Sequence, residues 1–164
     1  MLIGIIADTH DQKQRTRVAV QLLQSAGAQA LFHCGDLIEP DMVEICAAIT
    51  PGYFVFGNND EGRVDDIRSA ITHSRNSFCL ELAGELELAG KRIAITHGHC
   101  DKQVRRLLNQ EPDYLFTGHS HVAADWMEGV TRRINPGALH RASSFSVAIL
   151  NLANDHLQFL PVGR

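Results

Sequence analysis

The sequence of 164 residues has no run of Lys or Arg, and its formal net charge is −4. This absence argues against a protein that binds nucleic acid or a membrane surface through bulk positive charge. It does not argue against small phosphate ligands, because a bound metal ion can supply local positive charge to an acidic protein.

Long apolar segments and paired cysteines are also missing. The N-terminal stretch MLIGIIADTH is apolar for only a few residues, which is too short for a signal peptide or a membrane span. The four cysteines, Cys34, Cys46, Cys79 and Cys100, form no Cys-x-x-Cys pair. We therefore expect reduced thiols in a cytoplasmic protein, with Cys46 and Cys79 in the core.

The composition predicts a globular chain, because 45% of the residues are hydrophobic and 21% are charged. No repeat, low-complexity segment or linker interrupts it, so we expect one domain over residues 1–164.

The first third of the chain predicts alternating strands and helices. Short apolar runs at 2–7, 30–33 and 53–56 are typical of buried strands. Helical spacing predicts a helix over 14–26, with Gly27 in the position of a C-terminal cap. A second helix is predicted over 40–49, with a proline in its first turn. This order predicts a parallel sheet with right-handed crossovers.

The rest of the chain is mostly strand. Strands are predicted at 78–82, 85–88, 91–96, 113–117, 122–127, 131–134, 146–152 and 156–160, with glycine-containing turns at 83–84 and 89–90 and a short helix at 102–109. We therefore predict an α/β fold in which two mixed sheets pack face to face with helices outside.

Polar side chains follow five of these strands. The residues are Asp8, His10, Asp36, Asn58, His97, His99, His119 and His121. Each group alone is typical of a turn or a loop histidine, but the carboxyl ends of strands in an open α/β sheet are where ligands bind. Five strand ends that all carry Asp, Asn or His therefore predict one site.

The chemistry of this set predicts metal binding. Carboxylate, amide and imidazole ligands suit manganese, iron, zinc or nickel better than calcium, and the thiolates of a structural zinc site are absent. Two carboxylates, one amide and four of the imidazoles make seven ligands, which exceed the needs of one tetrahedral ion but fit two ions that share a carboxylate. Two divalent ions against two carboxylates leave a net charge of about +2, which attracts a phosphate.

In order and spacing, the sequence resembles the calcineurin-like metallophosphoesterases, in particular the small prokaryotic phosphodiesterases. The matching motifs are ADTH at 7–10, CGDLIE at 34–39, GNND at 57–60, THGH at 96–99 and GHSH at 118–121, with INPGA at 134–138 after them. The resemblance covers residues 2 to about 150. It implies the family's fold, a four-layer sandwich of two mixed sheets flanked by helices.

The resemblance also implies two ions that share Asp36, with manganese expected and nickel, zinc or iron as alternatives. The ligands of the first ion would be Asp8, His10, Asp36 and His121. The ligands of the second would be Asp36, Asn58, His97 and His119. His99 is not a ligand in this scheme, and two roles stay open for it: contact with the phosphate, or a structural loop histidine.

The stretch 57–60 is a turn by its local chemistry, and the resemblance makes Asn58 a ligand within that turn. Asn59 departs from the pattern of the large phosphatases, where a His donates a proton to the leaving group. Asn can hydrogen-bond a leaving oxygen but cannot transfer a proton at neutral pH. Asn59 and His99 are thus the candidate catalytic residues.

Several other polar residues carry weaker predictions. We expect His33 in the core, and His73, His140 and His156 at the surface or in structural roles. Asp60 either orients a ligand or closes the turn. Thr9 either caps a helix or faces the substrate.

These features predict a hydrolase of small phosphate esters that uses two metal ions. A hydroxide that bridges the ions would attack phosphorus in line, with phosphodiesters favoured over monoesters. The alternative is a protein-binding scaffold on the same fold, as in the retromer scaffold subunit. No long insertion separates the motifs, so we expect an open site without a cap domain. Assembly into a homo-oligomer stays open.

Overall fold

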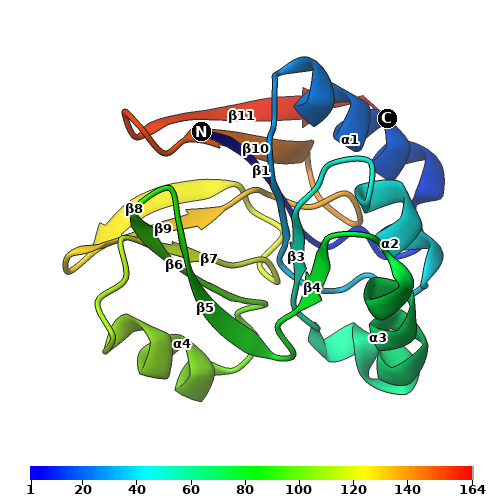
Figure 1. Ribbon diagram of the computed structural model, residues 1–164, viewed down its shortest axis with the longest axis horizontal. Coiled ribbons are helices and arrows are strands. Elements are labelled where there is room, and N and C mark those ends of the chain that lie inside the picture. The colour runs from blue at the N-terminus through cyan, green and yellow to red at the C-terminus, as the bar shows by residue number, and fades with distance from the viewer. Residues whose placement is uncertain (164) are drawn as a thin grey trace.

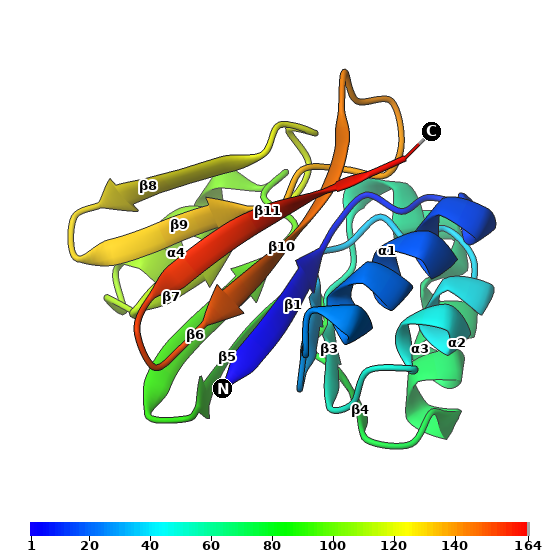
Figure 2. The same cartoon turned by 90° about the horizontal axis from the view of Figure 1, so that it is seen from above.

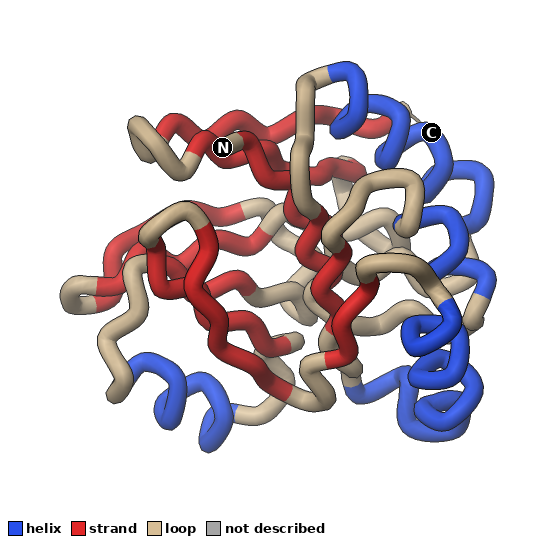
Figure 3. Tube along the Cα trace, in the orientation of Figure 1, coloured by secondary structure: helices blue, strands red, loops and turns tan. Residues whose placement is uncertain are grey.

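Residues 1–163 are described by a computed structural model, and they form four layers (Figures 1 and 2). Helices α1 (Lys13–Ser25), α2 (Asp41–Cys46) and α3 (Val64–His73) cover one face of a six-stranded sheet. A five-stranded sheet packs on its other face, and α4 (Asp101–Leu108) covers the outside of that second sheet. Figure 3 shows α1–α3 gathered on one side of the molecule and α4 alone on the other. The predicted fold class is confirmed.

The six-stranded sheet has the order β11-β10-β1-β2-β3-β4. Its strands are β1 (Leu2–Ile6), β2 (Leu31–His33), β3 (Gly52–Phe54), β4 (Ser77–Cys79), β10 (Phe145–Asn151) and β11 (His156–Val162). Strands β1 to β4 run parallel, and β10 and β11 add an antiparallel edge beside β1. The sheet is therefore mixed, as predicted.

The five-stranded sheet has the order β5-β6-β7-β9-β8. Its strands are β5 (Ala83–Leu88), β6 (Lys91–Thr96), β7 (Tyr114–Phe116), β8 (Ala124–Glu128) and β9 (Thr131–Asn135). The central strands β6, β7 and β9 are parallel, and both edges pair antiparallel.

The helices are α1 (Lys13–Ser25), α2 (Asp41–Cys46), α3 (Val64–His73) and α4 (Asp101–Leu108), and a 3₁₀ helix, η1 (Asn58–Arg63), precedes α3. Helix α1 ends where the sequence predicted: Gly27 has φ +86°, and its N–H bonds the carbonyl of Gln24.

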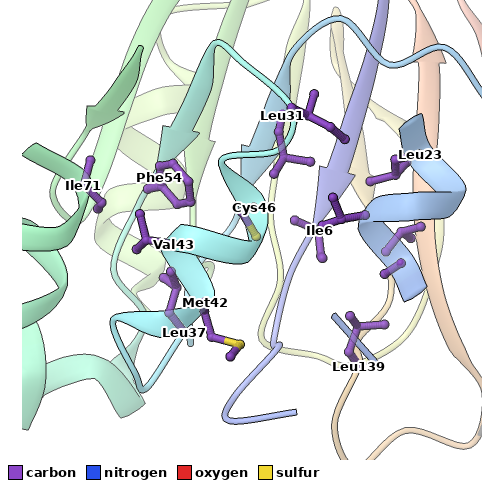
Figure 4. Close-up of a cluster of buried hydrophobic side chains, with 14 of the residues drawn as sticks. Ile6, Leu23, Leu31, Leu37, Met42, Val43, Cys46, Phe54, Ile71 and Leu139 are labelled. Atoms are coloured by element: carbon purple, nitrogen blue, oxygen red, sulfur yellow. The ribbon is translucent and has the colours of Figure 1, made fainter. Parts of the chain in front are cut away.

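The buried side chains of β1 divide between two cores, because alternate residues of a strand point to opposite faces. Ile3 and Ile5 pack between the two sheets, whereas Ile6 packs under the helices. Figure 4 shows Ile6 near Leu23 in this helix-side core. Gly4 lets α1 approach closely, since a Cβ there would lie 2.9 Å from Leu23 Cδ1.

Between β3 and β4, where we predicted no element, the structure has a helical segment, η1 and α3. Val64, Ile67 and Ile71 have helical spacing, and Ile67 and Ile71 are buried, so this signal was present in the sequence. Residues 83–84, predicted as a turn, instead begin β5. The strand predicted at 78–82 is the shorter β4, which pairs with β3.

The thiols divide by burial. Cys46 is buried, as predicted, and Cys34 is buried as well. The prediction for Cys79 is wrong: it is only half-buried, because β4 is the edge strand of its sheet. Within residues 1–163 no helix is both long enough and apolar enough to cross a membrane.

Candidate metal centre

The predicted ligands lie directly after parallel strands of both sheets. Asp8 and His10 follow β1, Asp36 follows β2, Asn58 begins η1 after β3, His97 follows β6, and His119 and His121 follow β7. The loops are tied to one another: the backbone N of His10 bonds Asp36 O over 2.9 Å, and Gly118 N bonds His97 O over 2.9 Å. Across the sheets, His119 N donates to Asp8 Oδ2 over 3.0 Å. The two sheets therefore contribute to one site.

Five of the seven predicted ligands have a left-handed backbone. Their φ values are +50° at Asp8, +45° at His10, +59° at Asp36, +68° at His119 and +58° at His121. Asp and His tolerate this region better than most residues, but it still costs free energy. Such conformations gather at functional sites, where the surrounding structure maintains them.

The side chains converge on two carboxylates. Asp36 Oδ2 lies 3.4 Å from His97 Nε2 and 3.6 Å from His10 Nε2. Asp8 Oδ1 lies 3.2 Å from His121 Nε2 and 3.9 Å from His97 Nε2. These contacts form two groups with metal-ligand spacing, Asp8–His10–His121 and Asp8–Asp36–His97.

Several of these atoms are buried without a hydrogen-bond partner among residues 1–163. They are Asp8 Oδ1, His10 Nε2, His97 Nε2 and His99 Nδ1. Because an unpaired buried polar atom costs about 1–3 kcal/mol, proteins rarely leave several of them together. The first three carry lone pairs that suit a divalent cation, so the residues present fit a metal centre.

Two imidazoles are held through their other nitrogen. His97 Nδ1 donates to the carbonyl of Cys34 over 2.7 Å, and His121 Nδ1 pairs with the carbonyl of Arg141 over 3.3 Å. These contacts place a proton on Nδ1, so each ring in its neutral form offers Nε2 to a metal ion. Metal-ligating histidines are commonly oriented in this way. Burial acts to lower the pKa of His97, but the Asp36 and Asp8 carboxylates raise it above its ordinary value, so metal binding at His97 would displace a proton.

The ionisation of the cluster also favours a cation. Burial acts to raise the pKa of Asp36, but His97 and the two N–H groups of Asn59 outweigh it and hold the pKa well below its usual range. Burial lowers the pKa of His10 to about 4, with a smaller contribution from His140. Burial raises the pKa of Asp8 to about 6. At neutral pH the carboxylates are thus ionised and His10 is neutral, as metal binding requires.

Asp60 holds the loop that carries Asp36. Its Oδ2 accepts from the backbone N of Gly57 over 2.7 Å and of Asp36 over 2.9 Å, and its Oδ1 accepts from Ile38 N over 2.7 Å. Asp60 is fully buried. Of the two roles that the sequence left open, it therefore does both: it closes the turn and supports the Asp36 loop.

We expect Asp60→Ala to destabilise the metal-free protein by about 2–4 kcal/mol, because three backbone N–H groups would lose a charged acceptor. Asp60→Asn, which keeps one acceptor oxygen, should lose less. Urea unfolding in the presence of a chelator measures both. Asp65→Ala is the control, since the side chain of Asp65 is 98% exposed. Equal stabilities of Asp60→Ala and Asp65→Ala would show that these hydrogen bonds contribute nothing.

His33 and Thr9 lie beneath the site and join the first two strand ends. His33 is fully buried, as predicted; its Nδ1 accepts from Gly35 N over 3.2 Å, so its Nε2 donates to Thr9 Oγ1 over 3.0 Å. Thr9 Oγ1 in turn donates to Asp36 O over 3.4 Å. Thr9 takes neither of the roles considered for it, because its burial keeps it from a substrate and the N-cap of α1 is Gln12.

Acid should destabilise the protein partly through His33. Burial lowers its pKa from 6.5 to about 3, so between these values the unfolded chain binds a proton that the folded one does not. Relative to His33→Gln, the wild type should lose up to about 1.4 kcal/mol per pH unit as the pH falls below about 6. Urea unfolding of metal-free protein at pH 7, 6 and 5 measures this difference. Parallel pH profiles for the two proteins would contradict it.

The remaining predicted site residues lie at the rim. Asn58, Asn59 and His119 are exposed and His99 is half-buried. The His119 and His99 rings lie 5.1 Å and 5.4 Å from the His97 ring, centre to centre. The Asn59 amide is turned onto Asp36 Oδ2 at 2.6 Å.

His140, predicted at the surface or in a structural role, lies at the site: its ring centre is 4.2 Å from that of His10. The signal available was its position two residues after the INPGA segment. That segment holds this loop near the first strand end, since Leu139 N bonds Asp8 O over 3.2 Å.

Comparison with known proteins agrees with the motifs. The sequence model of the calcineurin-like phosphoesterase superfamily domain matches residues 1–155, and the chain belongs to this superfamily. The resemblance inferred from the five motifs is thereby confirmed.

Individual relatives are distant in sequence. A phosphodiesterase of Methanocaldococcus jannaschii is 22% identical over 138 residues, which cover 84% of this chain and 83% of the relative. A solved structure described as a novel archaeal phosphodiesterase has a TM-score of 0.90 at 21% identity and covers 99% of this chain and 100% of its own. A single mutant of Vps29 from Entamoeba histolytica has a TM-score of 0.67 at 18% identity, with 99% and 100% coverage. The structural matches show the shared fold.

Proposed function

We propose that this protein is a binuclear metal-dependent phosphodiesterase. The observation that carries the proposal is the convergence of unpaired, buried ligand atoms on two carboxylates. Asp8 Oδ1, His10 Nε2 and His97 Nε2 have no hydrogen-bond partner among residues 1–163; both imidazole nitrogens lie beside Asp36 Oδ2, and His97 Nε2 also lies 3.9 Å from Asp8 Oδ1. The superfamily to which the chain belongs supports phosphoester hydrolysis.

In the proposed scheme Asp36 serves both ions, as the motifs imply, although Asp8 is the carboxylate common to both ligand groups of the metal-free structure. Asp36 Oδ2 lies 3.6 Å from His10 Nε2 and 3.4 Å from His97 Nε2, which the scheme assigns to different ions. The first ion would take Asp8, His10, Asp36 and His121. The second would take Asp36, Asn58, His97 and His119. For Asn58 and His119 the support is the motif and their place at the rim.

When bound, the ions would lower the pKa of a nucleophilic water and neutralise the charge that develops on the phosphate. The chain itself orients the ligands through Asp60 and through the carbonyls that hold His97 and His121. His99, half-buried beside His97, faces the same rim and would contact the phosphate. No group at position 59 can donate a proton, which favours esters with good leaving groups.

The decisive experiment is a substrate panel on metal-free protein reconstituted in turn with manganese, nickel, zinc and magnesium. We expect chelation to abolish hydrolysis, manganese to be among the ions that restore it, and aryl phosphodiesters to be cleaved faster than the matching monoesters. Full activity after exhaustive chelation would refute the metal-dependent mechanism. Faster cleavage of monoesters would replace the diesterase with a monoesterase.

A second candidate function is a protein-binding scaffold, which the likeness to Vps29 in fold allows. The edge strand β8 favours it: Met127 and Val130 lie at its C-terminal end with exposed fractions of 60% and 65%, and Val122, 62% exposed, precedes its other end. An exposed edge strand is a template for pairing with another chain. Analytical ultracentrifugation of the wild type and of Met127→Lys tests whether it joins copies of this chain. An active, metal-dependent enzyme would make catalysis the primary function.

A further inference from the structure

Asn59 hydrogen-bonds the carboxylate of Asp36, which the proposed scheme assigns to both ions. Its side-chain Nδ2 donates to Asp36 Oδ2 over 2.6 Å, and its backbone N donates to Asp36 Oδ1 over 3.0 Å. One residue therefore engages both oxygens. In the side-chain contact Asn59 is the donor and Asp36 is the acceptor, because an ionised carboxylate can only accept hydrogen bonds and the NH₂ group of the amide donates them.

Asp36 Oδ2 is the oxygen that lies close to both His10 and His97. Oδ2 lies 3.6 Å from His10 Nε2 and 3.4 Å from His97 Nε2. Oδ1 instead faces the backbone of the 57–60 turn: Asn59 N bonds it, and a Cβ on Gly57 would clash with it. Ions on the His10 side and the His97 side would therefore share Oδ2.

A carboxylate oxygen offers about two lone-pair positions. One ion and the Asn59 amide can occupy them together, but two ions need both. We propose that the Asn59 amide holds Asp36 Oδ2 in the metal-free and singly loaded protein, and that binding of the second ion displaces it. This inference rests on the two-ion function proposed above.

The displacement makes metal loading stepwise. Whichever ion binds first leaves the contact between Asn59 and Asp36 intact, whereas the ion that binds later, called the second ion from here on, binds only as that hydrogen bond breaks. Because Asn59 is exposed, its amide can then turn toward solvent or a substrate oxygen. Asn59 is thus a positioning residue that opposes the second ion, and removing its donor should tighten binding of that ion alone.

Isothermal titration of the metal-free protein with Mn²⁺ tests this. Asn59→Ala and Asn59→Leu, which lack the donor, should bind the second ion about tenfold more tightly, equivalent to about 1.4 kcal/mol, with little change in the first Kd. Asn109→Ala is the control, since Asn109 is an exposed residue at the end of α4. A second Kd that is unchanged or weaker in both Asn59 variants would overturn the inference.

A measurement on the unmutated protein avoids any folding defect of the variants. In ¹⁵N-labelled metal-free protein, the Asn59 side-chain NH₂ signal should carry the downfield shift of a short hydrogen bond to a carboxylate. One equivalent of Zn²⁺ should leave the shift in place, and the second should remove it. Loss of the shift with the first equivalent, or its persistence with two bound, would overturn the inference.

The titrations distinguish a failure of this inference from a failure of the two-ion function. A wild type that binds two ions and cleaves diesters, but whose Asn59 variants titrate like the wild type, would overturn this inference alone. A wild type that binds fewer than two ions would overturn the two-ion function, and this inference with it.

Discussion

Asp36→Asn is expected to lower kcat/KM for an aryl phosphodiester by about 10³-fold or more at saturating manganese, since a metal ion supplies several kcal/mol of transition-state stabilisation. The reason is the position of Asp36 Oδ2 between His10 and His97. A neutral amide at this position would weaken the binding of both ions. Asn58→Ala should cost less, because Asn58 is assigned to one ion only.

Metal content must be measured on each variant, so that loss of an ion is separated from loss of chemistry. Asp65→Asn is the matched control: it removes a carboxylate of the same type at an exposed position. Asp36→Asn should bind fewer ions than the control while unfolding cooperatively. If Asp36→Asn kept both ions and full activity, the assignment of the shared ligand would be wrong.

The second large effect concerns the leaving group. Because Asn59 cannot donate a proton, the leaving oxygen must depart as an anion or take a proton from water. General acid catalysis is typically worth about 10²–10⁴-fold, and its absence is felt most with basic leaving groups. Alkyl diesters should therefore turn over at least about 10²-fold more slowly than activated aryl diesters. A plot of log kcat/KM against leaving-group pKa should fall steeply.

The plot is informative only where chemistry limits the rate, which an unchanged rate in viscous solvent would establish. Asn59→His restores an imidazole to this position and should flatten the slope. A slope near zero in the wild type would show that another group already donates the proton. His99 is the residue to test first in that case, because its ring lies 5.4 Å from that of His97.

Much of the site could be predicted because its signals are local in sequence. Each motif is a short apolar run that ends in Asp, Asn or His, and strand ends in a parallel sheet meet at one edge. The segment between β3 and β4 was left without a predicted element, although Val64, Ile67 and Ile71 have helical spacing. Cys79 was wrongly predicted in the core because a short apolar run does not distinguish an edge strand from a central strand, and β4 is an edge strand.

The sequence by itself determined the superfamily, the alternation of strands and helices, and the types of ligand, because these depend on residue type and short spacing. The tertiary structure decided how the ligands are held. Asp60 and Asn59 act on Asp36 across 24 and 23 residues, and His140 reaches His10 across 130. Such contacts arise only when loops from different strands close on one another. No local pattern specifies them, because hydrogen bonds and ring contacts depend on distance in space rather than along the chain.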